Sequence, residues 1–455
     1  MDTTSSPLSP AAPAALSPRA VRPLRTLDLD PDDSFADLEW LGDVVGGARV
    51  LALGETAHYN RESFQLRRRL LAYLVRRHGF TAYAMETGFA ESARADAWVR
   101  GGAEPPARVQ ADGLTSLMGL WRPMRAHLEW MRAHNAGAAR PVGFYGIDLP
   151  GSHVSLVPGL AAVDAYLAEA DPGAGVEAAL RAGAEAVAAA SPFSAPAAMA
   201  AWARLPGAER EALVAGAAGV AERLRTGRER YVGRTGAAAF DRALRAAEST
   251  AALARMTAAM AGGDLNAVME VREEALAATV EWVLEREERV VVAAHNGHVG
   301  RWPCAVPGAA PTDSMGMRLA RALGTDYRVV GATAGAGHML NVGADFGEGV
   351  LFAGMAPPAP GSLDALMAAS CGGWPAGVDV RRLEGADAQA LAAAAGQRAG
   401  NGEEYTDVAA AVAFDALVHL PRLSPAQVDA EALAWVPEEV RVPFTRWRES
   451  VVSTK

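Results

Sequence analysis

The sequence predicts an α/β fold, in which a central, mostly parallel sheet is flanked by helices and a large alanine-rich helical insertion forms a lobe over the cleft. Short apolar runs alternate with segments whose apolar residues recur at helical spacing, a pattern typical of strands joined by crossover helices. Ionisable residues directly follow several of the apolar runs. A long stretch over residues 157–267 is rich in alanine and has no strand pattern. These three observations define the expected architecture.

The first part of the core is expected over residues 26–156. Apolar side chains at helical spacing predict a helix over residues 30–45, and the apolar run 49–53 predicts a strand that ends at Gly54. Asn60 is a favoured N-cap residue for the next helix, which Gly79 ends. The remaining elements expected in this part are a strand over residues 80–85, a helix over 90–100 and a strand over 141–147.

The helical insertion over residues 157–267 is expected to separate this part from a second one over residues 268–423. There the run RVVVAA at residues 289–294 predicts a strand that is buried on both faces. The other elements expected in this part are helices over residues 268–287 and 313–323 and strands over 328–333, 350–352, 378–383 and 414–420. Residues 1–25 are rich in proline, serine and alanine and are expected to form a disordered tail. Residues 424–455 form a C-terminal appendage, either packed as helices or loose.

Composition and charge exclude several classes of protein. The net charge of −10 argues against nucleic acid or an anionic membrane as the main partner. No segment has the apolar length of a membrane span or the pattern of a signal peptide, and two cysteines are too few for a disulfide framework. A cytoplasmic protein that acts on a small molecule is therefore expected, with its oligomeric state open. Because Lys455 is the sole lysine, lysine-based covalent chemistry has no candidate in the folded core.

Ionisable side chains follow four of the predicted strands. In chain order these are Glu55 with His58, Glu86, Asp148, and His295 with His298. The carboxyl ends of parallel strands meet at one edge of a sheet, where ligands bind. A histidine of near-neutral pKa takes a proton from water, carboxylates orient it, and further histidines donate hydrogen bonds to an oxyanion. The sequence therefore predicts a hydrolytic site that forms no covalent enzyme intermediate.

Other interpretations of these side chains stay open. Each could be a structural residue that is satisfied within the fold, and His295 and His298 with nearby carboxylates could bind a divalent metal ion. That pair follows a strand and does not lie on a regular helix, so we assign no metal and no cofactor. Arg67 is expected to anchor a site carboxylate or an anionic substrate group. The residues expected to line the pocket and contact the substrate are Tyr59, Trp121, Asp148, His153 and Asn296.

At these residues the sequence resembles the erythromycin esterase family, from about residue 25 to residue 423. The matching segments are Leu53–His58 (LGETAH) with Glu62, Glu86–Phe89, Gly146–Asp148, Arg272–Glu273, Ala294–Val299 (AHNGHV), Met315–Gly316 and Tyr327–Gly331. The resemblance implies that His58 is the general base for the attack of water on a macrolide lactone. It also implies that Glu55, Arg67, Glu86, His295 and His298 line the same site, under a helical lobe and without an obligate metal.

The sequence departs from the family pattern beside His58. Members commonly have Thr-His-Gly where this chain has Ala57-His58-Tyr59. A tyrosine there adds a ring and a hydroxyl where the substrate approaches, which argues against erythromycin itself; we expect an ester or macrolactone of a natural product, such as a macrolide, polyketide or similar ester. A biosynthetic dehydration, cyclisation or acyl transfer would use the same base. The non-enzymatic alternative is a haem- or metal-binding protein of related fold, which would need an export signal.

Overall fold

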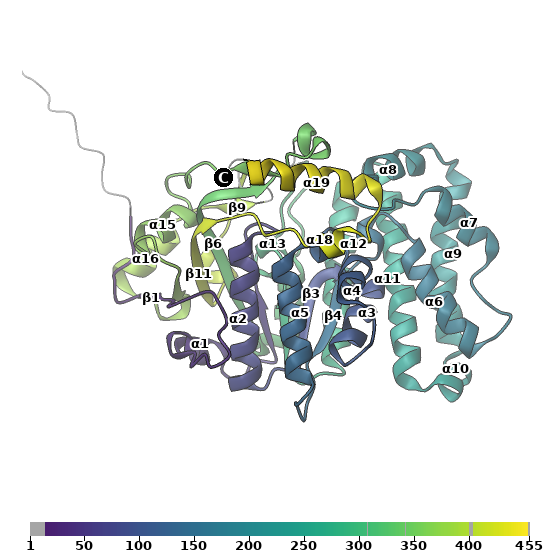
Figure 1. The fold of residues 1–455 in the computed structure, drawn as a ribbon, viewed down its shortest axis with the longest axis horizontal. Helices are drawn as coiled ribbons and strands as arrows, with labels where there is room; N and C mark the ends of the chain where they lie inside the picture. Colours follow the sequence, from purple (N-terminus) through teal and green to yellow (C-terminus); the bar gives the residue numbers. More distant parts are fainter. Residues whose placement is uncertain (1–13, 307, 342, 400–403, 454–455) are drawn as a thin grey trace, which may run out of the picture.

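The computed structural model of the chain describes residues 14–306, 308–341, 343–399 and 404–453. Its centre is a nine-stranded sheet with helices on both faces (Figure 1). The strands follow the order β1-β8-β11-β6-β2-β5-β3-β4, and β7 pairs with β6 off this path. Their bounds are β1 (Val21–Pro23), β2 (Val50–Leu53), β3 (Ala82–Gly88), β4 (Gly143–Asp148), β5 (Val290–Ala293), β6 (Tyr327–Leu340), β7 (Phe352–Gly354), β8 (Ala376–Asp379) and β11 (Ala416–Leu423). Strands β9 (Gln397–Ala399) and β10 (Glu404–Thr406) form a separate pair.

The sheet is mostly parallel, which confirms the predicted fold class. All neighbours from β11 to β4 are parallel, and the antiparallel pairs of this sheet are β1 with β8, β8 with β11 and β7 with β6. Strand β5 has the sequence VVVA and is buried throughout, as β-branched residues in a doubly covered sheet require. Along β2, Leu51 and Leu53 pack on one face of the sheet, and Val50 and Ala52 pack on the other.

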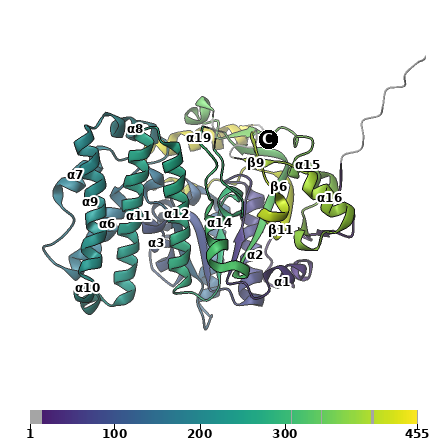
Figure 2. The same ribbon diagram turned by 180° about the vertical axis from the view of Figure 1, so that it is seen from behind.

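Two sets of helices cover these two faces. Helices α1 (Trp40–Val45), α2 (Arg61–His78) and α5 (Arg122–Asn135) pack on the face seen in Figure 1. Helices α12 (Leu265–Leu284), α14 (Met315–Leu323) and α15 (Leu363–Ser370) pack on the face seen in Figure 2. The other helices of the core are α3 (Phe89–Val99), α4 (Pro106–Gly113), α13 (Asn296–Val299), α16 (Gly385–Ala393) and α17 (Ala410–Ala413). Within the described residues, every helix is too short or too polar to cross a membrane.

The alanine-rich insertion forms helices with an apolar core of their own. They are α6 (Val157–Ala170), α7 (Ala178–Ala186), α8 (Ala195–Arg204), α9 (Gly207–Thr226), α10 (Arg228–Thr235) and α11 (Ala237–Ala261). Leu160, Trp202 and Phe240 are buried in that core. Figures 1 and 2 show the helices beside the β4 end of the sheet, next to α3 and α12. The helical nature of the insertion follows from its alanine content, since alanine has the highest helix propensity.

Part of the expected N-terminal tail is ordered, so that prediction is wrong for residues 14–25. Strand β1 pairs with β8, and Leu16 and Leu24 are buried. The backbone N–H of Ser17 donates to Asp387 Oδ1 at 2.7 Å. The average composition of the segment did not indicate this order. Two buried apolar side chains and one short strand are enough to attach an otherwise polar segment to the core. Residues 1–13 of the expected tail lie outside the described residues.

Several element boundaries also differ from those expected. The helix predicted over residues 30–45 is reduced to a 3₁₀ turn, η1 (Ala36–Leu38), and α1. The cause is a turn in which Asp33 Oδ1 accepts the N–H of Phe35 at 2.9 Å and Phe35 adopts a left-handed φ of 58°. Strand β8 ends at Asp379, whose side chain caps a 3₁₀ turn, η6 (Val380–Arg382), where the strand was expected to continue.

The C-terminal segment, for which packed and loose arrangements were both open, is packed. It forms α18 (Ala430–Leu433) and α19 (Glu438–Ser453). In Figure 1, α19 crosses the molecule from the core towards the insertion. Val440 and Phe444 on α19 are buried in the main core.

Candidate active site

The carboxyl ends of four adjacent strands form the floor of a cavity. Strands β2, β5, β3 and β4 are neighbours in that order and run parallel, so the segments that follow them lie side by side. The structure brings seven of the predicted side chains to this cavity: His58, Tyr59, Glu86, Asp148, His153, His295 and His298. Arg272, which was not predicted, also lines it.

The cavity is large enough for an organic substrate and has two kinds of wall. Its volume is about 450 Å³, within the range of about 300–1,000 Å³ that is usual for small-molecule sites. The ionisable side chains gather at the strand ends. The apolar lining comes from Ala57, Met118, Met269, Pro303, Ala305, Val306 and Leu340. Such a cavity can bury an apolar molecule and place one polar group of that molecule against the ionisable side chains at the strand ends.

His58 belongs to a histidine–carboxylate–arginine group. Its Nδ1 lies 2.7 Å from Glu55 Oε1, and Arg67 Nη1 lies 3.0 Å from the same oxygen. Arg67 is buried and also donates to the carbonyl oxygen of Ala294 at 2.8 Å, so its guanidinium is fixed beside Glu55. Burial would raise the pKa of Glu55, but the Arg67 charge and the hydrogen bond from His58 outweigh it and hold that pKa below its usual value.

The protonation of His58 follows from the same group. Burial would lower the pKa of His58, but its hydrogen bond to Glu55 and the negative charges of Glu86 and Glu55 raise it above 6.5. The side chain keeps 28% of its surface exposed. Its Nε2 has no hydrogen-bond partner among the described residues and is free to meet a ligand.

His295 is neutral and has both ring nitrogens engaged. Its Nδ1 accepts the N–H of Gly297 at 3.2 Å, and its Nε2 lies 3.3 Å from the carbonyl oxygen of Thr56. Burial and the neighbouring charge of His58 lower the pKa of His295 to about 4. Its ring centroid lies 5.8 Å from that of His58. The predicted use of His295 as a donor to an oxyanion therefore conflicts with its hydrogen bonds.

His298 is held between two carboxylates. Its Nδ1 lies 2.5 Å from Glu273 Oε1, and its Nε2 lies 3.3 Å from Glu86 Oε1. Burial would lower the pKa of His298, but the charges of Glu273 and Glu86 raise it well above its usual value. The ring is therefore a cation whose two N–H groups both face carboxylates. This geometry also conflicts with the predicted role of His298 as an oxyanion donor.

A second histidine–carboxylate–arginine group lies at the end of β4. His153 Nε2 is 2.7 Å from Asp148 Oδ2, and Arg272 Nη2 donates to the same oxygen at 2.7 Å. Arg272 Nη2 also lies 2.9 Å from Glu86 Oε1, so it connects the carboxylates of the neighbouring strands β3 and β4. Burial would raise the pKa of Asp148, but the charges of Arg272 and His153 hold it far below its usual value.

Tyr59 lies on the wall of the cavity, and Trp121 packs behind it. The Tyr59 hydroxyl donates to the carbonyl oxygen of Ser116, and the ring stacks on Trp121 with centroids 5.5 Å apart. Trp121 is fully buried behind Tyr59 and does not belong to the cavity lining described, which corrects its expected role. Tyr59 still presents surface to the cavity.

Asn296 is a structural clamp, which also corrects its expected role in substrate binding. Its Nδ2 donates to the carbonyl oxygen of Ala332 at 2.7 Å, and its Oδ1 accepts the N–H of Ala332 at 3.1 Å. The side chain is 1% exposed. A Cβ at Gly54 would lie 2.0 Å from Asn296 Oδ1, so a glycine is required for the close approach of β2 to this amide.

The sequence reasoning left Arg272 and Glu273 out of the site. Both lie on α12, whereas the prediction relied on residues that follow strands. Glu273 is fully buried and accepts from His298 and from the N–H of Met315 at 2.7 Å. The one signal in the sequence was the match of Arg272–Glu273 to the family pattern, because adjacent charges near a helix start are otherwise usually solvated.

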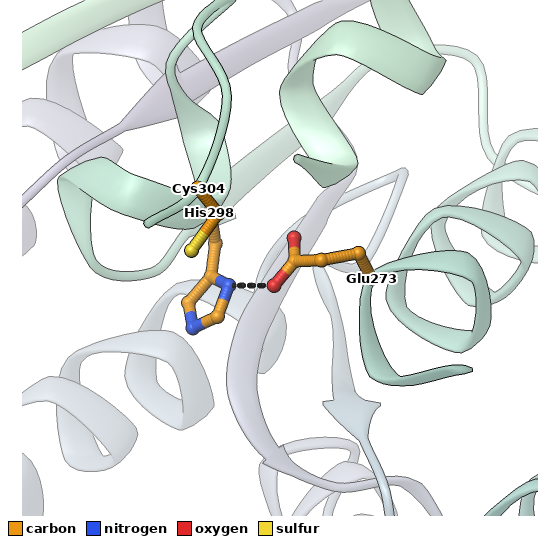
Figure 3. Close-up of side chains that lie close together, drawn as sticks. All are labelled: Glu273, His298 and Cys304. Atoms are coloured by element: carbon orange, nitrogen blue, oxygen red, sulfur yellow. Dashed lines mark hydrogen bonds and ion pairs between the residues drawn. The ribbon is translucent and has the colours of Figure 1, made fainter. Parts of the chain in front are cut away.

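Glu273, His298 and Cys304 are the described residues closest to a metal-binding set (Figure 3). Their potential ligand atoms lie within 4.8 Å of one another, and His295 is not in the group. Both carboxylate oxygens of Glu273 already accept hydrogen bonds, and burial raises the pKa of the Cys304 thiol. A metal ion would have to replace the Glu273–His298 hydrogen bond and displace the thiol proton. The side chains as they stand fit an ion pair better than a metal centre.

The fold and the site define a class of protein, namely an α/β enzyme with acid–base groups in a cavity at the strand ends. A model of the erythromycin esterase family matches residues 75–423, a range that begins after His58. The chain is 29% identical to erythromycin esterase type II of Escherichia coli over 325 residues, 68% of this chain and 74% of that protein. It is 34% identical to erythromycin esterase type I of Escherichia coli over 132 residues, 28% of this chain and 31% of that protein.

Solved structures show the same fold. A Bacillus cereus protein matches with a TM-score of 0.73 and 22% identity over 90% of this chain and 97% of that one. An erythromycin esterase mutant in its open conformation matches with a TM-score of 0.71 and 22% identity over 89% and 98% of the two chains. The chain belongs to the erythromycin esterase family, and it is therefore a hydrolase-like enzyme.

Proposed function

We propose that this protein hydrolyses an ester or a macrolactone of a natural product, with His58 as the general base that activates water. One observation carries this proposal: His58 has one ring nitrogen on the Glu55–Arg67 pair and the other free in the cavity. A carboxylate on Nδ1 fixes the orientation of the ring and stabilises the imidazolium that forms when Nε2 takes a proton.

Arg272 is our candidate for stabilising the negative charge that develops on the carbonyl oxygen. Both ring nitrogens of His295 and of His298 are engaged, so neither has a hydrogen to spare. Arg272 lines the cavity, and its Nη1 has no hydrogen-bond partner among the described residues. A guanidinium that is already fixed by two carboxylates stabilises such a charge without reorganisation. His298, whose Nε2 lies 3.3 Å from Glu86 Oε1, helps to hold that carboxylate beside Arg272.

The apolar part of the cavity indicates the class of substrate. Met118, Met269 and Val306 on its lining favour a hydrophobic acyl chain or macrocycle over a charged metabolite. The names of the relatives support the same class, since both are erythromycin esterases. The Tyr59 ring closes the wall beside His58, so the set of macrolactones accepted should differ from that of relatives with a glycine there.

The proposal is tested with His58→Asn and a panel of macrolides and simple esters, read by mass spectrometry. Hydrolysis adds the mass of one water, and we expect the variant to lose activity by about 10²–10⁴-fold while it stays folded. The exposed His338 on β6 supplies the matched control, His338→Asn, which should keep the wild-type rate. A product lighter by one water would indicate dehydration instead. Near wild-type activity of His58→Asn would refute the assigned base.

A further inference from the structure

The four histidines of the cavity divide into two pairs by the use of their ring nitrogens. His295 and His298 each have both nitrogens engaged by the protein. His58 and His153 each have one nitrogen on a carboxylate, and their other nitrogen has no hydrogen-bond partner among the described residues. Only the second pair can therefore exchange a proton with a ligand without first breaking a hydrogen bond.

The surroundings of His153 repeat those of His58. In each case the histidine lies 2.7 Å from a carboxylate oxygen, and an arginine nitrogen lies within 3.0 Å of that same oxygen. The two rings are also similarly accessible, with 28% of the His58 side chain and 27% of the His153 side chain exposed. A structural role would explain one such group, but two groups that open into one cavity have the arrangement that a general base and a general acid need.

The backbone at His153 is held in a conformation that needs support. Ser152 and His153 have left-handed φ values of 51° and 71°, a conformation that costs a non-glycine residue about 1–2 kcal/mol. Two hydrogen bonds fix the turn: the N–H of Gly151 donates to Glu91 at 2.7 Å, and the N–H of Ser116 donates to Ser152 Oγ at 2.9 Å. Strained residues that the surrounding structure over-determines cluster at active sites. Here the strain turns the His153 ring towards Asp148.

We propose that His153 is the general acid of the reaction, which donates the proton from its Nδ1 to the leaving alkoxide. This inference rests on the proposed function and deepens it. His58 Nε2 takes a proton from water, and the oxygen of that water forms a bond to the carbonyl carbon. The bond from this carbon to the alcohol oxygen then breaks, and that oxygen takes the proton from His153. Solvent removes the proton from His58 and restores the one on His153, so one water is consumed for each ester cleaved.

The positions of the two histidines suit opposite sides of one ester group. Strands β2 and β4 are three places apart in the sheet, which corresponds to roughly 14 Å at the usual strand spacing. Side chains that reach inwards from both ends leave room for a carbonyl group and its leaving oxygen between the rings. Arg272 reaches from the His153 group towards β3, because its Nη2 contacts both Asp148 and Glu86.

The test compares two esters of the same acid in His153→Asn, since asparagine tolerates a left-handed φ better than most residues. An alkyl ester needs a proton on its leaving oxygen, whereas a nitrophenyl ester releases a stable anion. We expect the variant to lose about 10²–10³-fold on the alkyl ester and less than about threefold on the nitrophenyl ester. The His58→Asn variant should lose activity equally on both, and the exposed His338→Asn control should lose none.

Equal loss on both esters, or no loss on either, would overturn the acid role of His153. If the wild-type protein cleaved neither ester, the proposed hydrolysis itself would fail, which is a different result. If His153→Asn does not fold, the role of His153 is tested on the wild-type protein with esters of one acid and a series of alcohols. A rate that hardly depends on the acidity of the leaving alcohol supports a general acid, and a steep dependence refutes it.

Discussion

The protonation state of His58 determines when the proposed site can act. A general base must be neutral, and the Glu55 and Glu86 carboxylates raise the pKa of His58 above 6.5. We therefore expect kcat/KM to rise with pH through a pKa above 6.5. Glu55→Gln removes one of the charges that raise this pKa, so the rising limb should move to lower pH while the maximal rate falls. A pH profile of both proteins checks this, and a rising limb that stays in place would contradict the assignment.

At the residue scale, Tyr59 occupies a backbone conformation that glycine adopts more easily. Its φ is 63°, in the region that glycine adopts without cost and other residues at about 1–2 kcal/mol. A glycine at this position would meet the same backbone requirement without that cost. In this chain the stacking on Trp121 and the hydrogen bond to Ser116 offset the strain. The sequence shows that a tyrosine stands here, but it does not show where the Tyr59 ring points.

At the scale of elements, α12 brings two charges into the site. Glu273 is fully buried against the charged His298, and the N–H of Met315 donates to its second oxygen. Glu273→Gln leaves the imidazolium with a neutral partner, so we expect the free energy of unfolding to fall by about 3 kcal/mol. Urea denaturation measures this change, and the exposed neighbour supplies the control Glu274→Gln, which should stay within about 0.5 kcal/mol of the wild type.

The same substitution has a defined pH dependence. The folded-state pKa of His298 is raised, so its stabilisation is fully present below the unfolded pKa of about 6.5 and is lost as pH rises through the folded value. The destabilisation by Glu273→Gln should therefore shrink as the pH is raised. A loss that is equal at acidic and alkaline pH would indicate that packing, not charge, holds α12 to this histidine.

Elements also show how far the sequence could predict the site. His58, Glu86, Asp148 and His295 follow apolar runs, and the end of a parallel strand is a position with known functional meaning. Arg272 and Glu273 lie on a helix, where a charged pair usually faces solvent, so no local pattern marked them. Asn296 was misassigned because a polar residue beside two histidines has the same sequence signal whether it contacts a ligand or a neighbouring strand.

At the scale of the whole molecule, the order of strands determines which groups meet. Strand β5 lies between β2 and β3, although about 200 residues separate it from β3 along the chain. This places His295 beside His58 and Glu86. The sequence predicted the strands and the helical insertion, but apolar runs carry no information about which strand lies next to which. The packing of β1 and α19 against the core likewise depends on a few buried side chains, which the average composition of each segment does not reveal.

The C-terminal helix reaches the site through a chain of aromatic contacts, and this connection can be tested. Phe444 on α19 is fully buried, with its ring centroid 5.4 Å from that of Trp121, which in turn stacks on Tyr59 beside His58. Phe444→Ala should lower the free energy of unfolding by about 3 kcal/mol, and the space it leaves lets Trp121 and Tyr59 move. We expect kcat/KM to fall while the pH profile keeps its midpoint, because the charges around His58 are unchanged.

Trp374, 71% exposed, gives the control Trp374→Ala, which should alter neither stability nor rate. If Phe444→Ala lost stability but kept the full rate on the macrolactone, α19 would support the fold without positioning the wall of the site.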